Sequence, residues 1–118
     1  MKILLDTNFL IDVIRFKISL SGLKGNDLFV LDLVIDEIRN VSRGKGKDAV
    51  SAKLALRLVD GKSLKVLKSK EKEADLSLLE HAKKGYVIAT QDLRLKKKLD
   101  KAGGKYICIR QKKYIMTE

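Results

Sequence analysis

The sequence predicts an α/β fold in which a central parallel sheet carries helices on both faces. Short apolar runs alternate along the chain with stretches of helical periodicity, and no proline interrupts them. Parallel strands need long crossover connections, which are usually helices, so this alternation favours a parallel sheet. The chain has 118 residues, the common size of one domain. We therefore expect a single domain over residues 1–118.

The N-terminal half predicts three strands and three helices. Ile3-Leu4-Leu5 is fully apolar, and residues 9, 10, 13 and 14 follow it at helical spacing. Gly61 is a stop signal for the last of these helices. We expect strands at residues 3–5, 28–33 and 64–67, and helices at residues 9–14, 34–41 and 47–59.

The C-terminal half continues the same alternation. Ala74, Leu78, Leu79 and Ala82 share one helical face, and Gly85 stands where such a helix would end. The run YVIAT predicts a strand, LRLKKKLDKA a basic helix ended by two glycines, and KYICI a final strand. The expected helices span residues 71–84 and 93–102, and the expected strands span residues 86–90 and 105–109.

The charge of the chain indicates a polyanionic partner. Lysine and arginine number 26 against 15 acidic residues, which gives a net charge of +11. The excess gathers in the C-terminal half, and nucleic acid is the simplest partner for it. A lysine-rich surface also suits solubility or heat resistance, so both interpretations stay open.

Composition also bounds the location of the protein. Residues of the apolar set make up 45% of the chain, which excludes a disordered polypeptide. No apolar run approaches the roughly 20 residues that span a membrane. Cys108 is the single cysteine and has no partner for an internal disulfide. We expect a cytoplasmic protein without a membrane segment.

Two aspartates follow apolar strands directly. Asp6 comes after ILL, and Asp92 comes two residues after the end of YVIAT. The carboxyl ends of parallel strands form the usual site of an α/β fold, so both carboxylates can project into one crevice. Like charges held together there demand a cation between them. The alternative is that each aspartate only caps the helix that follows it.

Two further acids lie on predicted helices. In VIDEIRNV, Glu37 flanks the apolar stripe, whereas Asp36 points away from it. Asp75 falls on the apolar stripe of the helix at residues 71–84, where an unpaired charge is costly. A metal, a base or the backbone donors at the helix start would justify that place. Glu71 shares this face and is a second choice.

Oxygen ligands without a histidine or cysteine cluster favour Mg²⁺ or Mn²⁺. Such a cation activates water and stabilises charge on a phosphodiester, so hydrolysis of a nucleic-acid backbone is the natural reaction. Thr7, Asn8 and Thr90 can support the acids, although turn capping explains them as well. Lys96, Lys97 and Lys98 are weak candidates for backbone contacts. His81, the one histidine, is expected at the surface.

Four segments together resemble the PIN-domain family: LLDTNFLID, VIDEI, ADLSLLEHA and YVIATQDLRLKKKL. The resemblance implies a three-layer α/β/α fold and an endoribonuclease dependent on Mg²⁺ or Mn²⁺. It maps the acidic cluster of the family onto Asp6, Glu37, Asp75 and Asp92. Related sequences often have a second acid after the helix aspartate, where this chain has Leu76. The resemblance therefore leaves open whether one metal or two would bind.

The resemblance also bears on the biological role. The C-terminal third is similar to nucleases that process ribosomal RNA and to their archaeal relatives, so rRNA processing is the first expectation. VapC-type toxins share the catalytic pattern, and a toxin would need an antitoxin partner. A non-catalytic RNA-binding module is the third alternative. A homodimer and a ribosome-assembly factor are further expected partners.

Overall fold

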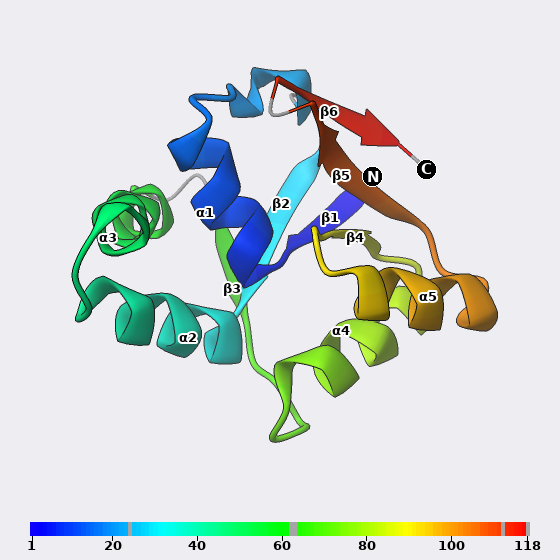
Figure 1. Cartoon of the computed structure of the whole chain (residues 1–118). Coiled ribbons are helices and arrows are strands. Elements are labelled where there is room, and N and C mark those ends of the chain that lie inside the picture. Colours follow the sequence, from blue (N-terminus) through cyan, green and yellow to red (C-terminus); the bar gives the residue numbers. More distant parts are fainter. Residues whose placement is uncertain (24, 62–63, 112, 118) are drawn as a thin grey trace.

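The computed structural model describes residues 1–23, 25–61, 64–111 and 113–117 (Figure 1). In this part of the chain, the strands are β1 (Lys2–Leu5), β2 (Asp27–Leu31), β3 (Lys65–Leu67), β4 (Val87–Ala89), β5 (Tyr106–Arg110) and β6 (Tyr114–Thr117). The helices are α1 (Thr7–Arg15), α2 (Asp32–Ser42), α3 (Lys47–Asp60), α4 (Ala74–Lys83) and α5 (Leu93–Ala102), with a short 3-10 helix at Leu20–Leu23.

The strands form one sheet in the order β3-β2-β1-β4-β5-β6. All neighbours from β3 to β5 are parallel, and β6 pairs with β5 in the antiparallel direction. Helices α1, α2 and α3 gather on one side of the sheet, while α4 and α5 lie on the other (Figure 1). The predicted three-layer α/β/α fold is therefore confirmed.

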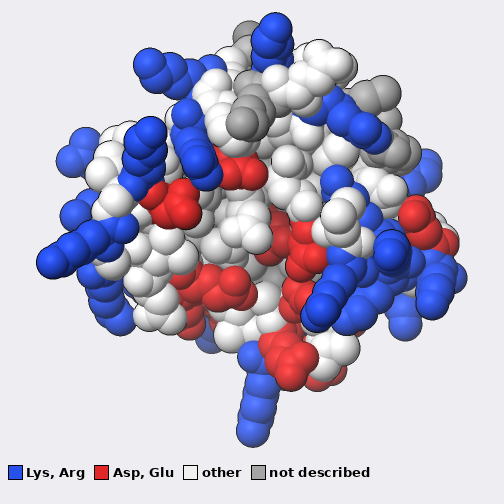
Figure 2. All heavy atoms as spheres, in the orientation of Figure 1, with Lys and Arg blue, Asp and Glu red and all other residues white. Residues whose placement is uncertain are grey.

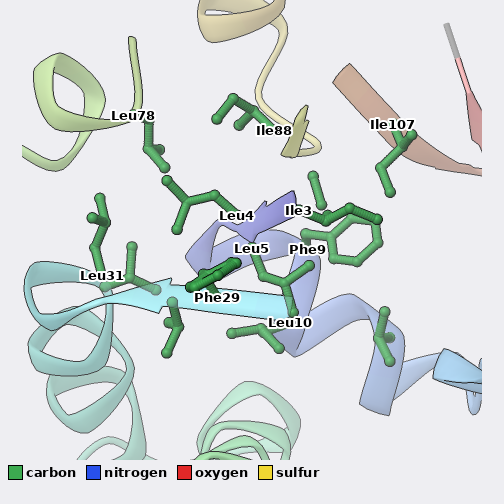
Figure 3. Packing of buried hydrophobic residues seen from close by; sticks show 14 of the residues in the cluster. Ile3, Leu4, Leu5, Phe9, Leu10, Phe29, Leu31, Leu78, Ile88 and Ile107 are labelled. Atoms are coloured by element: carbon green, nitrogen blue, oxygen red, sulfur yellow. The ribbon is translucent and has the colours of Figure 1, made fainter. Parts of the chain in front are cut away.

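The core explains why the central strands read as continuous apolar runs. Ile3, Leu4 and Leu5 of β1 are all buried, because helices cover both faces of the sheet. Phe9 and Leu10 of α1 are fully buried and belong to the same cluster (Figure 3). This packing fixes the position of the residue between β1 and α1, which is Asp6.

Most predicted elements are present, with shifted ends. The strand predicted at residues 28–33 stops at Leu31, since α2 already begins at Asp32. The helix predicted at residues 71–84 begins only at Ala74. By contrast, α5 spans the predicted residues and ends at Ala102, and Gly103 caps it with a φ of 73°, the left-handed conformation that glycine tolerates.

Two elements were not predicted. The strand at residues 105–109 is not the final one, because Tyr114–Thr117 turns back and pairs with β5 at the edge of the sheet. Gln111 has a φ of 54° in the connecting turn. This left-handed conformation is uncommon for glutamine, so the residue type does not predict it. The segment Leu20–Leu23 forms a 3-10 helix between two predicted elements. Neither error changes the order of the parallel strands.

The carboxyl edge of the sheet collects the starts of helices. Asp6 caps α1 directly after β1, and Asp32 begins α2 directly after β2. Asp92 caps α5 shortly after β4. Neighbouring parallel strands deliver these three aspartates to one edge of the sheet. Within the described ranges, the structure contains no helix of the length and apolar character that crossing a membrane requires.

Candidate functional site

Asp6 lies at the centre of the acidic edge, which is the carboxyl edge of the sheet around Asp6, Glu37, Asp75 and Asp92. The residue is 6% exposed, and its carboxylate accepts two hydrogen bonds, one from the Thr7 backbone N–H to Oδ1 at 2.7 Å and one from the Thr90 hydroxyl to Oδ2 at 2.9 Å. The Asp6 N–H donates to the Ala89 carbonyl at 2.9 Å, which joins the ends of β1 and β4. The predicted capping role is confirmed, and it coexists with a place at the sheet edge.

The environment of Asp6 favours its neutral form. Burial raises the pKa of Asp6 from 3.8 to about 6, although the hydrogen bonds from Thr90 and Thr7 lower it. The negative charges of Glu37 and Asp75 raise the pKa of Asp6 further. Three of the predicted carboxylates are therefore near enough to repel one another.

Glu37 reaches this edge from α2. The Thr7 hydroxyl, itself buried, donates to Glu37 Oε2 at 3.1 Å. Glu37 is exposed as a residue, but partial burial of its carboxyl raises its pKa, the hydrogen bond from Thr7 lowers it, and the charge of Asp75 raises it. Asp36 is exposed and pairs with Arg39 at 3.8 Å, as its position opposite the apolar stripe predicts.

Asp75 occupies the first turn of α4 and is half-buried. The buried face of α4 consists of Ser77, Leu78, His81 and Ala82, so Asp75 lies at the end of this stripe rather than within the core. Glu71 is exposed and precedes the helix. Because Asp75 lies in the first turn of α4, it faces the acidic edge and is less buried than the sequence predicted.

Asp92 caps α5 as predicted. Its Oδ1 accepts hydrogen bonds from the backbone N–H groups of Arg94 at 2.8 Å and Leu95 at 3.3 Å. The Asp92 N–H donates to the Thr90 hydroxyl oxygen at 3.1 Å. Thr90 is fully buried, and its hydroxyl joins the Asp92 backbone N–H to the Asp6 carboxylate. The threonine therefore connects Asp6 to the backbone of Asp92, while the Asp92 carboxylate caps α5.

The four acids surround the edge without forming a closed cage. Among the described residues, no three Asp, Glu, His or Cys side chains are arranged as a ready metal-binding group. The available donors are nevertheless carboxylate and hydroxyl oxygens, the ligands that Mg²⁺ and Mn²⁺ prefer. Burial is the main cause of the raised pKa values of Asp6 and Glu37, and a divalent cation would offset the mutual repulsion that adds to it. The chemistry of this donor set fits such an ion.

The predicted supporting residue Asn8 and the predicted RNA-binding lysines lie in different parts of the surface. Asn8 is exposed and lines a hollow of about 280 Å³ with Asp12 and Gln91, among others. Lys96 and Lys97 line a second hollow, and Lys98 does not contribute to it. Figure 2 shows acidic side chains near the centre of this face and a dense group of basic side chains on the right, over α5.

The prediction of a surface position for His81 is wrong. His81 is buried, its Nδ1 lies 2.7 Å from the Ser77 carbonyl oxygen, and its ring meets Tyr86 edge to face at 5.3 Å between centroids. These contacts place His81 in the packing of α4 against the sheet.

Asp32 is a structural acid that the sequence analysis missed. Its Oδ1 accepts hydrogen bonds from the Leu33 N–H at 2.8 Å, the Ser69 N–H at 2.9 Å and the Ser69 hydroxyl at 2.6 Å. The Ser69 hydroxyl is the main reason that the pKa of Asp32 is lowered. Asp32 thereby ties the start of α2 to the connection that leads into α4. An aspartate directly after the apolar FVL run was the available signal.

The chain is an α/β/α domain with carboxylates around the carboxyl edge of its parallel sheet, which is the usual place for the site of such a fold. Residues 3–112 match the family described as a PIN like domain, and the chain belongs to that family. The chain is also similar to ribonuclease VapC4 of Methanocaldococcus jannaschii, with 32% identity over 124 residues that cover 96% of this chain and 93% of the relative.

Proposed function

We propose that the protein is an endoribonuclease that depends on a divalent metal and hydrolyses RNA phosphodiester bonds. The convergence of carboxylates around buried Asp6 carries the proposal. The Thr90 hydroxyl joins the Asp6 carboxylate to the backbone N–H of Asp92, and the charges of Glu37 and Asp75 add to the burial that raises the pKa of Asp6. A fold that gathers repelling acids at a sheet edge supports a cation-binding role more than simple helix capping.

Asp6, Glu37, Asp75 and Asp92 are the proposed ligands of Mg²⁺ or Mn²⁺. When bound, such a cation lowers the pKa of water and stabilises the negative charge that develops on the phosphate. The hydroxyls of Thr90 and Thr7 orient the carboxylates of Asp6 and Glu37 by donating hydrogen bonds to them. These hydrogen bonds leave further lone pairs on the carboxylate oxygens for a metal.

The relative named ribonuclease VapC4 favours a VapC-type ribonuclease over the rRNA-processing branch that the sequence first suggested. In this proposal the protein is the toxin of a toxin–antitoxin pair, RNA is its substrate and an antitoxin is its partner. A role in rRNA processing, a homodimer and a ribosome-assembly partner stay predictions. The similarity extends along nearly the whole of both chains, which supports a shared activity more than a shared fold alone.

The test is cleavage of end-labelled single-stranded RNA by the purified protein with Mn²⁺, with Mg²⁺ or with EDTA. We expect cutting with a metal and none with EDTA. Asp6→Asn and Asp92→Asn should each reduce the rate at least about 100-fold, because even groups that only orient metal ligands change activity by about 10- to 100-fold. Asp36→Asn is the matched control, since Asp36 is exposed and paired with Arg39.

Two results would contradict the proposal. Cutting that persists in EDTA would exclude the metal, and cutting that survives Asp6→Asn would remove the acidic edge from the reaction. Binding of RNA without cutting in either metal would instead favour the non-catalytic RNA-binding module.

A further inference from the structure

A hollow of about 360 Å³ lies between α5 and β5, beside the acidic edge. Leu93, which lines its start, directly follows Asp92 in the chain. The lining residues come from one helix and one strand: Leu93, Lys96, Lys97, Asp100, Tyr106, Cys108, Ile109 and Arg110. The hollow therefore begins next to one of the four proposed metal ligands.

The helix presents a single stripe to this hollow. Leu93, Lys96, Lys97 and Asp100 follow one another at helical spacing, so they share one side of α5. At 1.5 Å per residue the stripe is about 10 Å long, which matches one or two nucleotides rather than a duplex. Buried Leu95 and Leu99 anchor the opposite side of the helix in the core. The orientation of the stripe is thus fixed by packing.

The floor and the walls of the hollow differ in chemistry. Tyr106 and Cys108 are buried and form an apolar floor, and the Lys96 ammonium lies 6.0 Å from the centre of the Tyr106 ring. Lys97 and Arg110 are exposed and add positive charge beside the floor. An apolar surface bordered by cations is the arrangement that suits a nucleotide with its base and its phosphate.

Leu93 is 71% exposed at the entrance. A single exposed leucine needs no explanation by itself. This one, however, follows Asp92 in the chain and lines the hollow together with Lys96 and Lys97. An apolar side chain in that place can pack against a base once the adjoining phosphate is held.

We propose that this hollow binds a nucleotide of single-stranded RNA next to the phosphate that is cut. Lys96, Lys97 and Arg110 contact the RNA backbone, and Leu93 packs against the base. The inference rests on the proposed ribonuclease function, because it places the substrate beside the acidic edge. Asp100 closes the far end of the stripe, so the strand runs from the acidic edge along α5 for about 10 Å.

The test measures binding of a fluorescein-labelled 12-nucleotide oligouridine by anisotropy, in EDTA, at several salt concentrations. We expect Lys96→Ala/Lys97→Ala to raise the Kd about 10-fold and to reduce the slope of log K against log salt by about 1.4, since two phosphate contacts are lost. Leu93→Ala should weaken binding about threefold with an unchanged salt slope, because it removes no charge.

Lys53→Ala/Arg57→Ala is the matched control. It also removes two positive charges, but from exposed positions of α3, which lies on the other side of the sheet from α5 (Figure 1). We expect its Kd to stay within about twofold of the parent protein. Equal losses in the two double variants would overturn the inference, because binding would then follow net charge alone. Equally tight binding of duplex RNA of the same length would overturn it too.

Cleavage by the same variants separates this inference from the function on which it rests. Metal-dependent cutting by the parent together with unchanged binding and cutting by Lys96→Ala/Lys97→Ala would reject the hollow and leave the ribonuclease intact. RNA binding that depends on Lys96, Lys97 and Leu93, but without cutting in any metal, would support the hollow and reject the nuclease.

Discussion

The Thr90 hydroxyl donates a hydrogen bond to Asp6 Oδ2 at 2.9 Å, across 84 positions of sequence. The same oxygen accepts the N–H of Asp92 at 3.1 Å. One buried side chain directly after β4 therefore joins the Asp6 carboxylate to the backbone N–H of Asp92 and helps to orient that carboxylate.

Removing this hydroxyl should change the acidity of Asp6. In Thr90→Val the hydrogen bond that lowers the pKa of Asp6 is lost, so the pKa should rise further above about 6. Titration of the Asp6 carboxyl carbon by NMR, without metal, measures this shift. Thr90→Ser keeps a hydroxyl and should stay near the parent value. A pKa that is the same in Thr90→Val and the parent would show that Thr90 does not stabilise the carboxylate.

Asp6 should make the stability of the metal-free protein depend on pH. Because its folded pKa is raised from 3.8 to about 6, the folded state favours the protonated carboxyl. The stability that this protonation contributes is fully present below pH 3.8 and is lost as the pH rises through 6. At about 1.4 kcal/mol per pKa unit, the loss amounts to at most about 3 kcal/mol.

Asp6→Asn should consequently unfold at higher urea than the parent at pH 7.5 in EDTA, and the advantage should vanish near pH 4. The neutral amide can still accept the hydrogen bond of the Thr7 N–H. Asp36→Asn, at an exposed position, should change the free energy of unfolding by less than about 0.5 kcal/mol at either pH. An Asp6→Asn protein that is less stable than the parent at pH 7.5 would contradict this reasoning.

The hydrogen bonds between Ser69 and Asp32 should contribute stability of the opposite pH dependence. Ser69→Ala removes the hydroxyl that does most to lower the pKa of Asp32, and it should cost about 1 kcal/mol at pH 7. A group with a lowered folded pKa loses its contribution as the pH falls, so the cost should shrink below the ordinary pKa of 3.8. Urea denaturation at pH 7 and pH 3 measures it. A cost that is as large at pH 3 as at pH 7 would exclude the charge of Asp32 as its source.

Ser77 offers a stabilising substitution. It is fully buried in α4, and its hydroxyl oxygen has no hydrogen-bond partner among the described residues. Ser77→Ala removes an unpaired buried polar group and improves helix propensity, so it should raise the free energy of unfolding by about 1 kcal/mol. Thermal unfolding tests this directly. A lower melting temperature would mean that the hydroxyl has a partner in solution.

The strands and their order of alternation with helices were predictable because buried parallel strands leave continuous apolar runs such as ILL and YVIA. Asp6 and Asp92 were found for the same reason, since each follows such a run. Asp32 was missed although it also follows one, because LFVLDL reads as one longer strand. The hydrogen bonds that it makes to Ser69 span 37 residues, and no local pattern predicts a contact at that separation.

Other features depend on tertiary contacts that the sequence does not display. His81 lies at the edge of a weak apolar stripe, and only the packing of Tyr86 against it decides its burial. The strand Tyr114–Thr117 follows a run of lysines and exists because β5 offers an unpaired edge. Lys96 and Lys98 look equivalent in RLKKKLDK. Only the structure distinguishes them, because Lys96 lines the hollow beside β5 and Lys98 does not.

The central claim is that the acids around Asp6 hold a divalent cation, and Mn²⁺ binding measured by calorimetry at pH 7.5 tests it most directly. We expect the parent protein and Asp36→Asn to bind Mn²⁺ alike, and Asp6→Asn to bind it at least about 10-fold more weakly, since a proposed ligand is lost. No binding to the parent protein, or equal binding to the parent and Asp6→Asn, would contradict the account.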